Sequence, residues 1–253
     1  MTYMATQEFL LLSKSFVDLP HGWGRIAWKW RKDHWQRMMA IVYWMAQDGI
    51  STGVELRKRA GIGPNAMGKI FTSLQVGIPD PLVEVQTVRL GLLALTIVNL
   101  TELGKRLGKA LRNDVDPVES DWEKLARLHK ADEQVKHAAL VLFAAYQARL
   151  RGWKAEVVPF NPEETPWFQP DLKVTAPDGT SYYVEVETHV WARPEKWATK
   201  RSVNLVVQYP IQRKKMVQNF RDAGISGHAT DLKTLAKAAA SNDLSSFWLD
   251  TWH

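Results

Sequence analysis

Three carboxylates whose types and spacing could support catalysis occur in the second half of the chain. One is in Pro170-Asp171 and two are in Glu185-Val186-Glu187, and the turn signature Pro177-Asp178-Gly179 lies between these segments. Residues i and i+2 of a β-strand point to the same face, so Glu185 and Glu187 project together. A hairpin through the turn would bring the carboxylate of Asp171 alongside them.

Carboxylates held at close range repel one another unless a cation lies between them. Hard oxygen ligands suit Mg²⁺ or Mn²⁺. Such an ion can activate a water molecule and stabilise the charge of a phosphodiester transition state. We expect Asp171 and Glu185 to be the metal ligands, and Glu187 to orient the attacking water or to complete the ion's shell. On this reasoning, removing the carboxylate of Asp171 relieves repulsion and leaves the metal-free protein no less stable. The alternative is a hairpin whose acidic side chains are simply exposed to solvent.

The elements around these acids predict a mixed sheet with flanking helices. Ser120 and Glu123 form a capping-box signature at a helix start. The segment 138–146 is apolar on every side, as in a helix buried on both faces. The predicted helices are 120–130, 132–151, 194–201, 210–223 and 231–240, and the predicted strands are 153–159, 170–174, 181–188, 203–209 and 225–230.

This order resembles the core of the PD-(D/E)XK nuclease superfamily, over about residues 131–230. The resemblance implies that Asp171 and Glu185 are the two metal-binding acids. Glu187 stands where the family usually has Lys, although some restriction enzymes of the superfamily have Glu there. Lys196 or Lys200, on the predicted helix after the hairpin, could supply the missing amine. Two further residues are implied on the first helix: an acid, Glu133, and His137 one turn later on the same side.

The seven histidines show none of the spacings typical of zinc motifs, so we expect each to be a surface or hydrogen-bonded residue. His189 lies closest in sequence to the Glu-x-Glu strand. No glycine-rich segment has the pattern of a phosphate loop or of a dinucleotide-binding turn. Nucleotide hydrolysis and dinucleotide binding are therefore not expected.

The first half predicts three helices, two strands and a further helix. Apolar residues at helical spacing predict a helix over 33–48, and Ser51 or Thr52 can cap a second helix ending near residue 60. A Gly-bearing turn then leads to a third helix. The remaining elements are the third helix at 64–74, the strands at 82–89 and 94–99, and a helix at 102–111 capped by Thr101.

This pattern resembles the winged helix-turn-helix of MarR-type regulators, over roughly residues 33–112. The resemblance implies that the third helix enters a DNA major groove. The DNA-binding candidates are Asn65, Lys69, Thr72, Arg57 and Arg89. The wing tip, residues 89–93, is apolar where DNA-touching wings are usually basic. We expect it to pack on the second half, on a partner protein or on a second copy of the chain. The alternative is that the whole unit binds protein.

Net charge also separates the two halves. Residues 1–115 contain 15 Lys and Arg against 9 Asp and Glu, whereas residues 116–253 contain 18 of each. The excess positive charge of +6 therefore lies in the first half, which favours a nucleic acid partner there. Within residues 1–32, the segment 22–32 interleaves aromatic and basic residues. It can bind a nucleic acid backbone, or form an arm that packs on the body.

Three segments are therefore expected in an α+β protein of 253 residues: an arm (1–32), a winged helix-turn-helix (33–115) and an α/β nuclease-like domain (116–253) with the mixed sheet of restriction endonucleases. No apolar run is long enough to span a membrane, and no export signal opens the chain, so we expect a cytoplasmic protein. The chain has no Cys, which excludes disulfides and thiolate chemistry.

The domain order resembles the replication-relaxation family of plasmid and mobile-element proteins. It implies a protein that binds DNA and cleaves or processes it with Mg²⁺ or Mn²⁺. A DNA-binding regulator or replication accessory factor with an inactive nuclease-like half is the second hypothesis. A scaffold that holds partners is the third.

Overall fold

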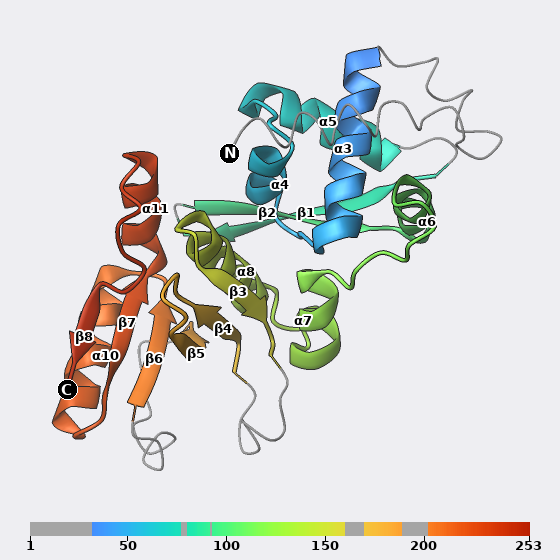
Figure 1. Cartoon of the computed structure of the whole chain (residues 1–253). Helices are drawn as coiled ribbons and strands as arrows, with labels where there is room; N and C mark the ends of the chain where they lie inside the picture. The colour runs from blue at the N-terminus through green and yellow to red at the C-terminus, as the bar shows by residue number, and fades with distance from the viewer. Residues whose placement is uncertain (1–31, 77–79, 92, 160–169, 189–201) are drawn as a thin grey trace. The chain divides into compact units, whose positions relative to one another are not determined.

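Two compact units make up the part of the chain that the computed structural model describes: residues 32–76, 80–91, 93–159, 170–188 and 202–253 (Figure 1). The first unit runs to Arg89 and resumes over Leu93–Glu123, and the second contains Lys124–His253 with Leu90 and Gly91. Helices and two separate sheets form a mixed fold, consistent with the α+β class expected. The predicted arm, 1–32, lies outside the described residues except for Lys32, which begins the first described helix, and the predicted helix at 194–201 also lies outside them.

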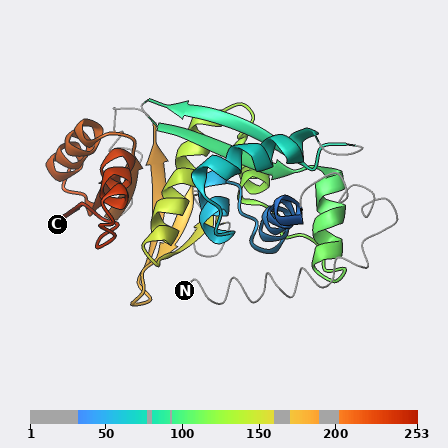
Figure 2. The same cartoon turned by 90° about the horizontal axis from the view of Figure 1, so that it is seen from above.

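The first unit has the elements that its sequence predicts, with ends shifted by a few residues. Its helices and strands are α3 (Lys32–Asp48), α4 (Gly53–Arg59), α5 (Pro64–Val76), β1 (Val83–Leu90), β2 (Leu93–Leu100) and α6 (Glu102–Leu111). The strands β1 and β2 pair as a long two-stranded ribbon, seen from above in Figure 2. Gly91, with φ +62°, lies in the turn between them.

The core of the first unit forms where α3 packs against the other helices. Met38, Ile41 and Met45 project from α3 and are at most 2% exposed. Gly108 of α6 allows close packing, because a Cβ at this position would lie 2.6 Å from the Cβ of Ala46. A larger residue at 108 would therefore push α6 away from α3.

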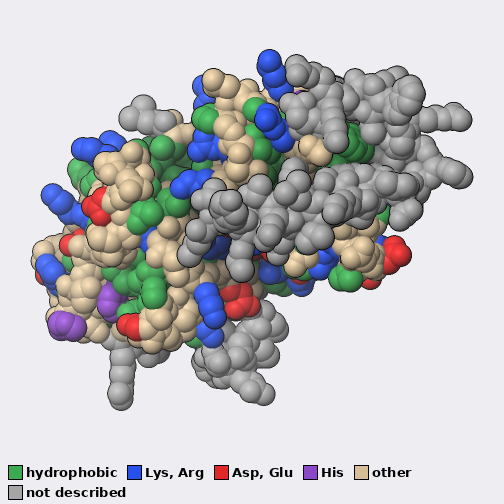
Figure 3. Space-filling model, turned by 45° about the horizontal axis from the view of Figure 1, so that its top comes forward, with side chains coloured by type: hydrophobic (Ala, Val, Ile, Leu, Met, Phe, Trp, Pro, Cys, Tyr) green, Lys and Arg blue, Asp and Glu red, His purple; other side chains and the backbone are tan. Residues whose placement is uncertain are grey.

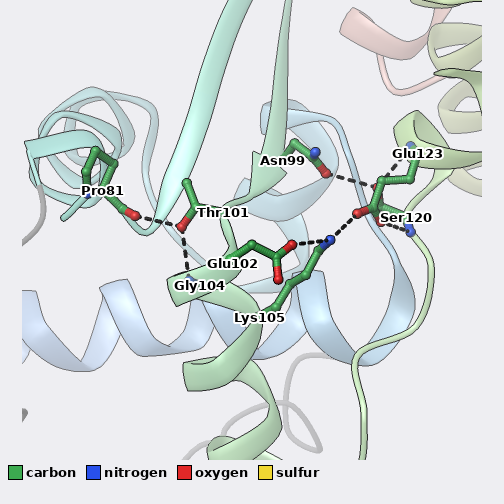
Figure 4. Close-up of polar contacts among 8 residues, drawn as sticks. All are labelled: Pro81, Asn99, Thr101, Glu102, Gly104, Lys105, Ser120 and Glu123. Atoms are coloured by element: carbon green, nitrogen blue, oxygen red, sulfur yellow. Dashed lines mark hydrogen bonds and ion pairs between the residues drawn. The ribbon is translucent and has the colours of Figure 1, made fainter.

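Side-chain caps fix the ends of α6 and α7 (Asp121–His129), as Figure 4 shows. Thr101 accepts a hydrogen bond from the amide of Gly104 and donates one to the carbonyl oxygen of Pro81. Ser120 and Glu123 make the predicted capping box: each side chain accepts a bond from the other residue's amide, at 3.2 and 2.8 Å. Lys105 of α6 then pairs with Glu123 at 2.8 Å. The start of α7 is thereby tied to α6.

The second unit is a six-stranded mixed sheet with helices packed on it. Its elements are α8 (Val135–Leu150), β3 (Lys154–Val157), β4 (Leu172–Thr175), β5 (Ser181–Glu187), β6 (Ser202–Val207), α10 (Pro210–Asp222), β7 (Ser226–Asp231), α11 (Leu232–Ala240) and β8 (Asp250–Trp252). The strands lie in the order β3-β4-β5-β6-β7-β8. The pairs β5–β6 and β6–β7 are parallel, and the other pairs are antiparallel.

The predicted hairpin is confirmed. β4 and β5 pair antiparallel, with Leu172 opposite Val184 and Thr175 opposite Ser181. Gly179 has φ +91°, a conformation that L side chains rarely adopt, and its amide closes the turn onto the carbonyl of Ala176. The strand β8 was not predicted, because it is only three residues long; it pairs antiparallel with β7.

Charged side chains that are buried or half-buried connect the elements around β7 and β8. Asp231, fully buried, caps α11 through the amide of Thr234 at 2.7 Å. Its second oxygen lies 3.1 Å from a guanidinium nitrogen of Arg213 on α10, and Arg213 also lies 3.0 Å from Asp250 of β8. The pairs therefore connect α10, α11 and β8. Among the described residues, no helix is both long and apolar enough to cross a membrane.

The cap at Thr101 gives a test of the first unit. Thr101→Ala removes the acceptor of the Gly104 amide and the donor to Pro81, so the free energy of unfolding should fall by about 0.5–2 kcal/mol in chemical denaturation. The matched control is Thr72→Ala, an exposed threonine on α5 whose loss should cost less than about 0.5 kcal/mol. Equal stability of the two variants would show that the cap does not hold α6.

Candidate metal centre and candidate nucleic-acid interface

Asp171 lies in the bend directly before β4, and its side chain is 4% exposed. Its Oδ2 atom accepts a hydrogen bond of 2.7 Å from the backbone amide of Val186 in β5. Its own carbonyl oxygen accepts from the amide of Val158, just after β3. Asp171 is therefore fixed on both sides, by its backbone to the β3 end and by its side chain to β5.

Two histidines from different helices converge on the other oxygen of this carboxylate. His129 is the last residue of α7, and His137 lies near the start of α8. The Oδ1 atom of Asp171 is 3.3 Å from Nδ1 of His129 and 2.9 Å from Nε2 of His137. The two rings are nearly parallel, with an interplanar angle of 10°. These two nitrogens and a carboxylate oxygen lie within 4.8 Å of one another, so the three side chains could hold a metal ion.

The pKa values of the two imidazoles shift in opposite directions. Burial lowers the pKa of His129, the neighbouring His137 lowers it further, and the charge of Asp171 opposes both. Burial also acts to lower the pKa of His137, but the hydrogen bond and charge of Asp171, with the charges of Glu187 and Glu185, raise it overall. The acids thus create a negative potential that favours a cation beside His137.

Glu185 and Glu187 lie next to this group on β5. Because Leu172 pairs with Val184, the next residues along the two strands are Asp171 and Glu185. Glu185 is buried and Glu187 is half-buried. In the parallel register, Glu185 lies opposite Leu205 and Glu187 opposite Val207, so the two acids share a face of the sheet as the alternation predicts.

Glu133 does not have the position expected for it. The helix α8 begins at Val135, so Glu133 lies in the turn before it, where its side chain is 70% exposed and 3.8 Å from Lys130. The helix expected over 132–151 begins only at Val135, because Lys130 takes a left-handed conformation, φ +49°, and the amides of Glu133 and Gln134 bond to its carbonyl oxygen in a turn. Lys196, Lys200 and His189 lie outside the described residues.

The expectation that the histidines do not cluster was also wrong. Zinc spacings are read along one helix, whereas His129 and His137 lie on two helices separated by a turn. The carboxylate that joins them is more than thirty residues further along the chain. The one feature of the sequence that could have indicated this pair is that the two histidines lie on either side of the predicted boundary between the helices 120–130 and 132–151.

The candidate nucleic-acid surface is the outer face of α5. Asn65, Lys69 and Thr72 are exposed there, whereas Met67, Ile70 and Leu74 are buried in the core of the first unit. Gln75 continues the same polar stripe. Amide, hydroxyl and ammonium groups of this kind can contact base edges and phosphates.

The other basic candidates are placed differently. Arg89 is exposed at the end of β1, and Arg57 is half-buried on α4. On the face drawn in Figure 3, Lys and Arg side chains are exposed in several separate places. The packing expected for the apolar wing tip remains a prediction.

Comparison of the chain with protein-family models, with curated proteins and with solved structures gives no match. The site geometry and the fold therefore carry the functional argument.

Repulsion among the acids alone predicts that removing the Asp171 carboxylate does not destabilise the protein. The hydrogen bonds of this carboxylate predict the opposite, a loss of stability. Asp171→Ala leaves the Val186 amide and the His137 imidazole without their acceptor, so the metal-free protein should lose about 1–3 kcal/mol of stability. Thermal melts in the presence of a chelator measure this. Glu156→Ala, at an exposed position of β3, is the control and should change stability by less than about 0.5 kcal/mol. A variant at Asp171 that melts at or above wild type would show that carboxylate repulsion dominates.

Proposed function

We propose that this protein binds DNA through its first unit and hydrolyses DNA phosphodiester bonds at the Asp171 centre of its second unit. The observation that carries the proposal is the buried carboxylate of Asp171, which is held by the Val186 amide, neighbours Glu185 in the hairpin and lies against two imidazoles. A negatively charged, partly buried group of this kind suits a divalent cation and a phosphate substrate.

The order of elements supports the same proposal. A helix, three antiparallel strands and a parallel fourth strand follow one another as α8, β3, β4, β5 and β6. This is consistent with the nuclease-like core that the Pro-Asp and Glu-x-Glu segments resemble. The acids lie at the open end of the hairpin, where β4 begins and β5 ends, so they are close together at the same end of two neighbouring strands.

Each residue of the centre has a separate task in the proposed reaction. A bound Mg²⁺ or Mn²⁺ would lower the pKa of a coordinated water and stabilise the negative charge of the transition state, in which the phosphorus is five-coordinate. Asp171 and Glu185 would bind and position the ion. The carboxylate of Glu187, half-buried on the same face as Glu185, would orient the attacking water by accepting a hydrogen bond from it.

The first unit would supply the DNA affinity. The order α4, turn, α5, hairpin and α6 is consistent with a winged helix-turn-helix, and the exposed polar stripe of α5 is the surface that would enter a major groove. Phosphate contacts from basic side chains would set the register, and Asn65 and Thr72 would contact base edges.

A second candidate is a DNA-binding regulator or replication accessory factor whose second unit does not cut. The presence of Glu187 where a lysine is usual favours it, because a carboxylate cannot supply the amine that steadies the water and the phosphate. Cleavage and binding assays on the same preparations distinguish the two functions.

Cleavage should depend on Asp171. Asp171→Asn removes the charge but keeps an oxygen that can accept from the Val186 amide, so the fold should be preserved. Loss of metal-centred stabilisation worth several kcal/mol should slow nicking of supercoiled plasmid by about a thousandfold or more in Mg²⁺ or Mn²⁺. Asp178→Asn, in the hairpin turn, is the control and should cut at the wild-type rate. If wild type cleaves neither plasmid, duplex nor single-stranded DNA, the regulator becomes the better account.

DNA affinity should depend on the outer face of α5. Lys69→Ala should weaken duplex binding and lower the slope of log affinity against log salt by about 1, because one phosphate contact is lost. Lys233→Ala, an exposed lysine at the start of α11, should leave both quantities unchanged. An unaltered salt slope for Lys69→Ala in gel-shift titrations would rule out docking through this helix face.

A further inference from the structure

The types of donor atom around Asp171 indicate which class of metal ion the site would bind. Two of the three are imidazole nitrogens, which are softer donors than carboxylate oxygens and suit zinc and other transition metals better than Mg²⁺. From the acids alone, a purely oxygen-ligated site was expected. With His129 and His137 as ligands, the site would prefer a transition metal to the Mg²⁺ considered in the proposed reaction.

Two of the three donor separations fit one shared ion. Atoms that each lie about 2.1 Å from a metal at tetrahedral or octahedral angles are about 3.0–3.4 Å apart. The observed separations from Oδ1 of Asp171, 3.3 Å to Nδ1 of His129 and 2.9 Å to Nε2 of His137, are close to this range. The third separation, between the two imidazole nitrogens, is no more than 4.8 Å, and rotation of the side chains would bring all three donors onto the ion.

The surroundings hold the donors in this arrangement. The Val186 amide occupies Oδ2 of Asp171 and so leaves Oδ1 turned toward the imidazoles. His129 is the last residue of α7, and its Nδ1 atom, 3.3 Å from Oδ1 of Asp171, is the ring nitrogen that faces the carboxylate. Glu185 and Glu187 lie close enough for their charges to act on His137, and they add negative potential for a dication.

We propose that His129, His137 and Asp171 form a two-histidine, one-carboxylate site for a divalent transition metal of the Zn²⁺ class, with selectivity over Mg²⁺. Three protein ligands leave at least one coordination position for water or for a phosphate oxygen, as in catalytic rather than structural zinc sites. This inference rests on the proposed function only for the use of that open position. The metal-binding site itself would stand without any nuclease activity.

The test is metal binding by the full chain without a histidine tag. After chelator treatment and dialysis, wild type should bind one equivalent of Zn²⁺ in calorimetry and retain it in millimolar Mg²⁺. Co²⁺ should give a visible absorption band that Zn²⁺ removes. His129→Gln and His137→Gln should each weaken Zn²⁺ binding by at least about tenfold, and more if both are changed. His228→Gln, in the same unit but hydrogen-bonded to Asn204, should bind like wild type.

Three results would overturn the proposal: no Zn²⁺ binding by folded wild type, displacement of Zn²⁺ by equimolar Mg²⁺, or full affinity in both His129→Gln and His137→Gln. The wild-type competition with Mg²⁺ remains decisive if a variant fails to fold. Failure of the nuclease proposal is distinguishable, because it would leave tight Zn²⁺ binding without DNA cleavage. Conversely, Mg²⁺-dependent cleavage combined with full Zn²⁺ affinity in both histidine variants would refute this site and retain the nuclease.

Discussion

The hydrogen bond from the Val186 amide to Asp171 is the contact on which the proposed centre depends. It joins the start of β4 to the end of β5 and takes one oxygen of a carboxylate that is almost fully buried. The other oxygen is then available to the imidazoles of His129 and His137. A single backbone donor thus determines which oxygen of Asp171 faces the imidazoles. The rings lie there because α7 ends at His129 and α8 begins at Val135, two residues before His137.

Much of this architecture could be predicted because local signals agree with the tertiary packing. The capping box of Ser120 and Glu123, the positive-φ Gly179 and the apolar face of α5 all predicted elements that the structure contains. Alternation along β5 placed Glu185 and Glu187 on one face. The register of the hairpin followed from its turn, and it placed Asp171 beside Glu185.

The histidines could not be found in the same way. The carboxylate is joined to β5 through one hairpin, whereas His129 and His137 reach it only through the placement of α7 and the packing of α8 on the sheet. Their positions depend on the turn that begins at the left-handed residue Lys130 and delays the start of α8 to Val135. In this turn Glu133 is exposed to solvent, and His137 in the first turn of α8 lies against Asp171.

The division into two units separates the two proposed tasks. The core around α3 and the core of the mixed sheet are distinct clusters of buried residues. The proposed recognition by α5 and the proposed chemistry at Asp171 therefore belong to residues of different units. A chain built in this way can lose one activity and keep the other, so a regulator and a nuclease can share the same fold.

The most direct test of the metal centre is anomalous X-ray scattering from crystals soaked with Zn²⁺ or Mn²⁺, collected on both sides of the metal's absorption edge. The account predicts one strong peak about 2.0–2.3 Å from Oδ1 of Asp171 and within bonding distance of Nδ1 of His129 and Nε2 of His137. It is contradicted if soaked crystals show no peak there and the carboxylate still lies in hydrogen-bonding contact with the imidazoles.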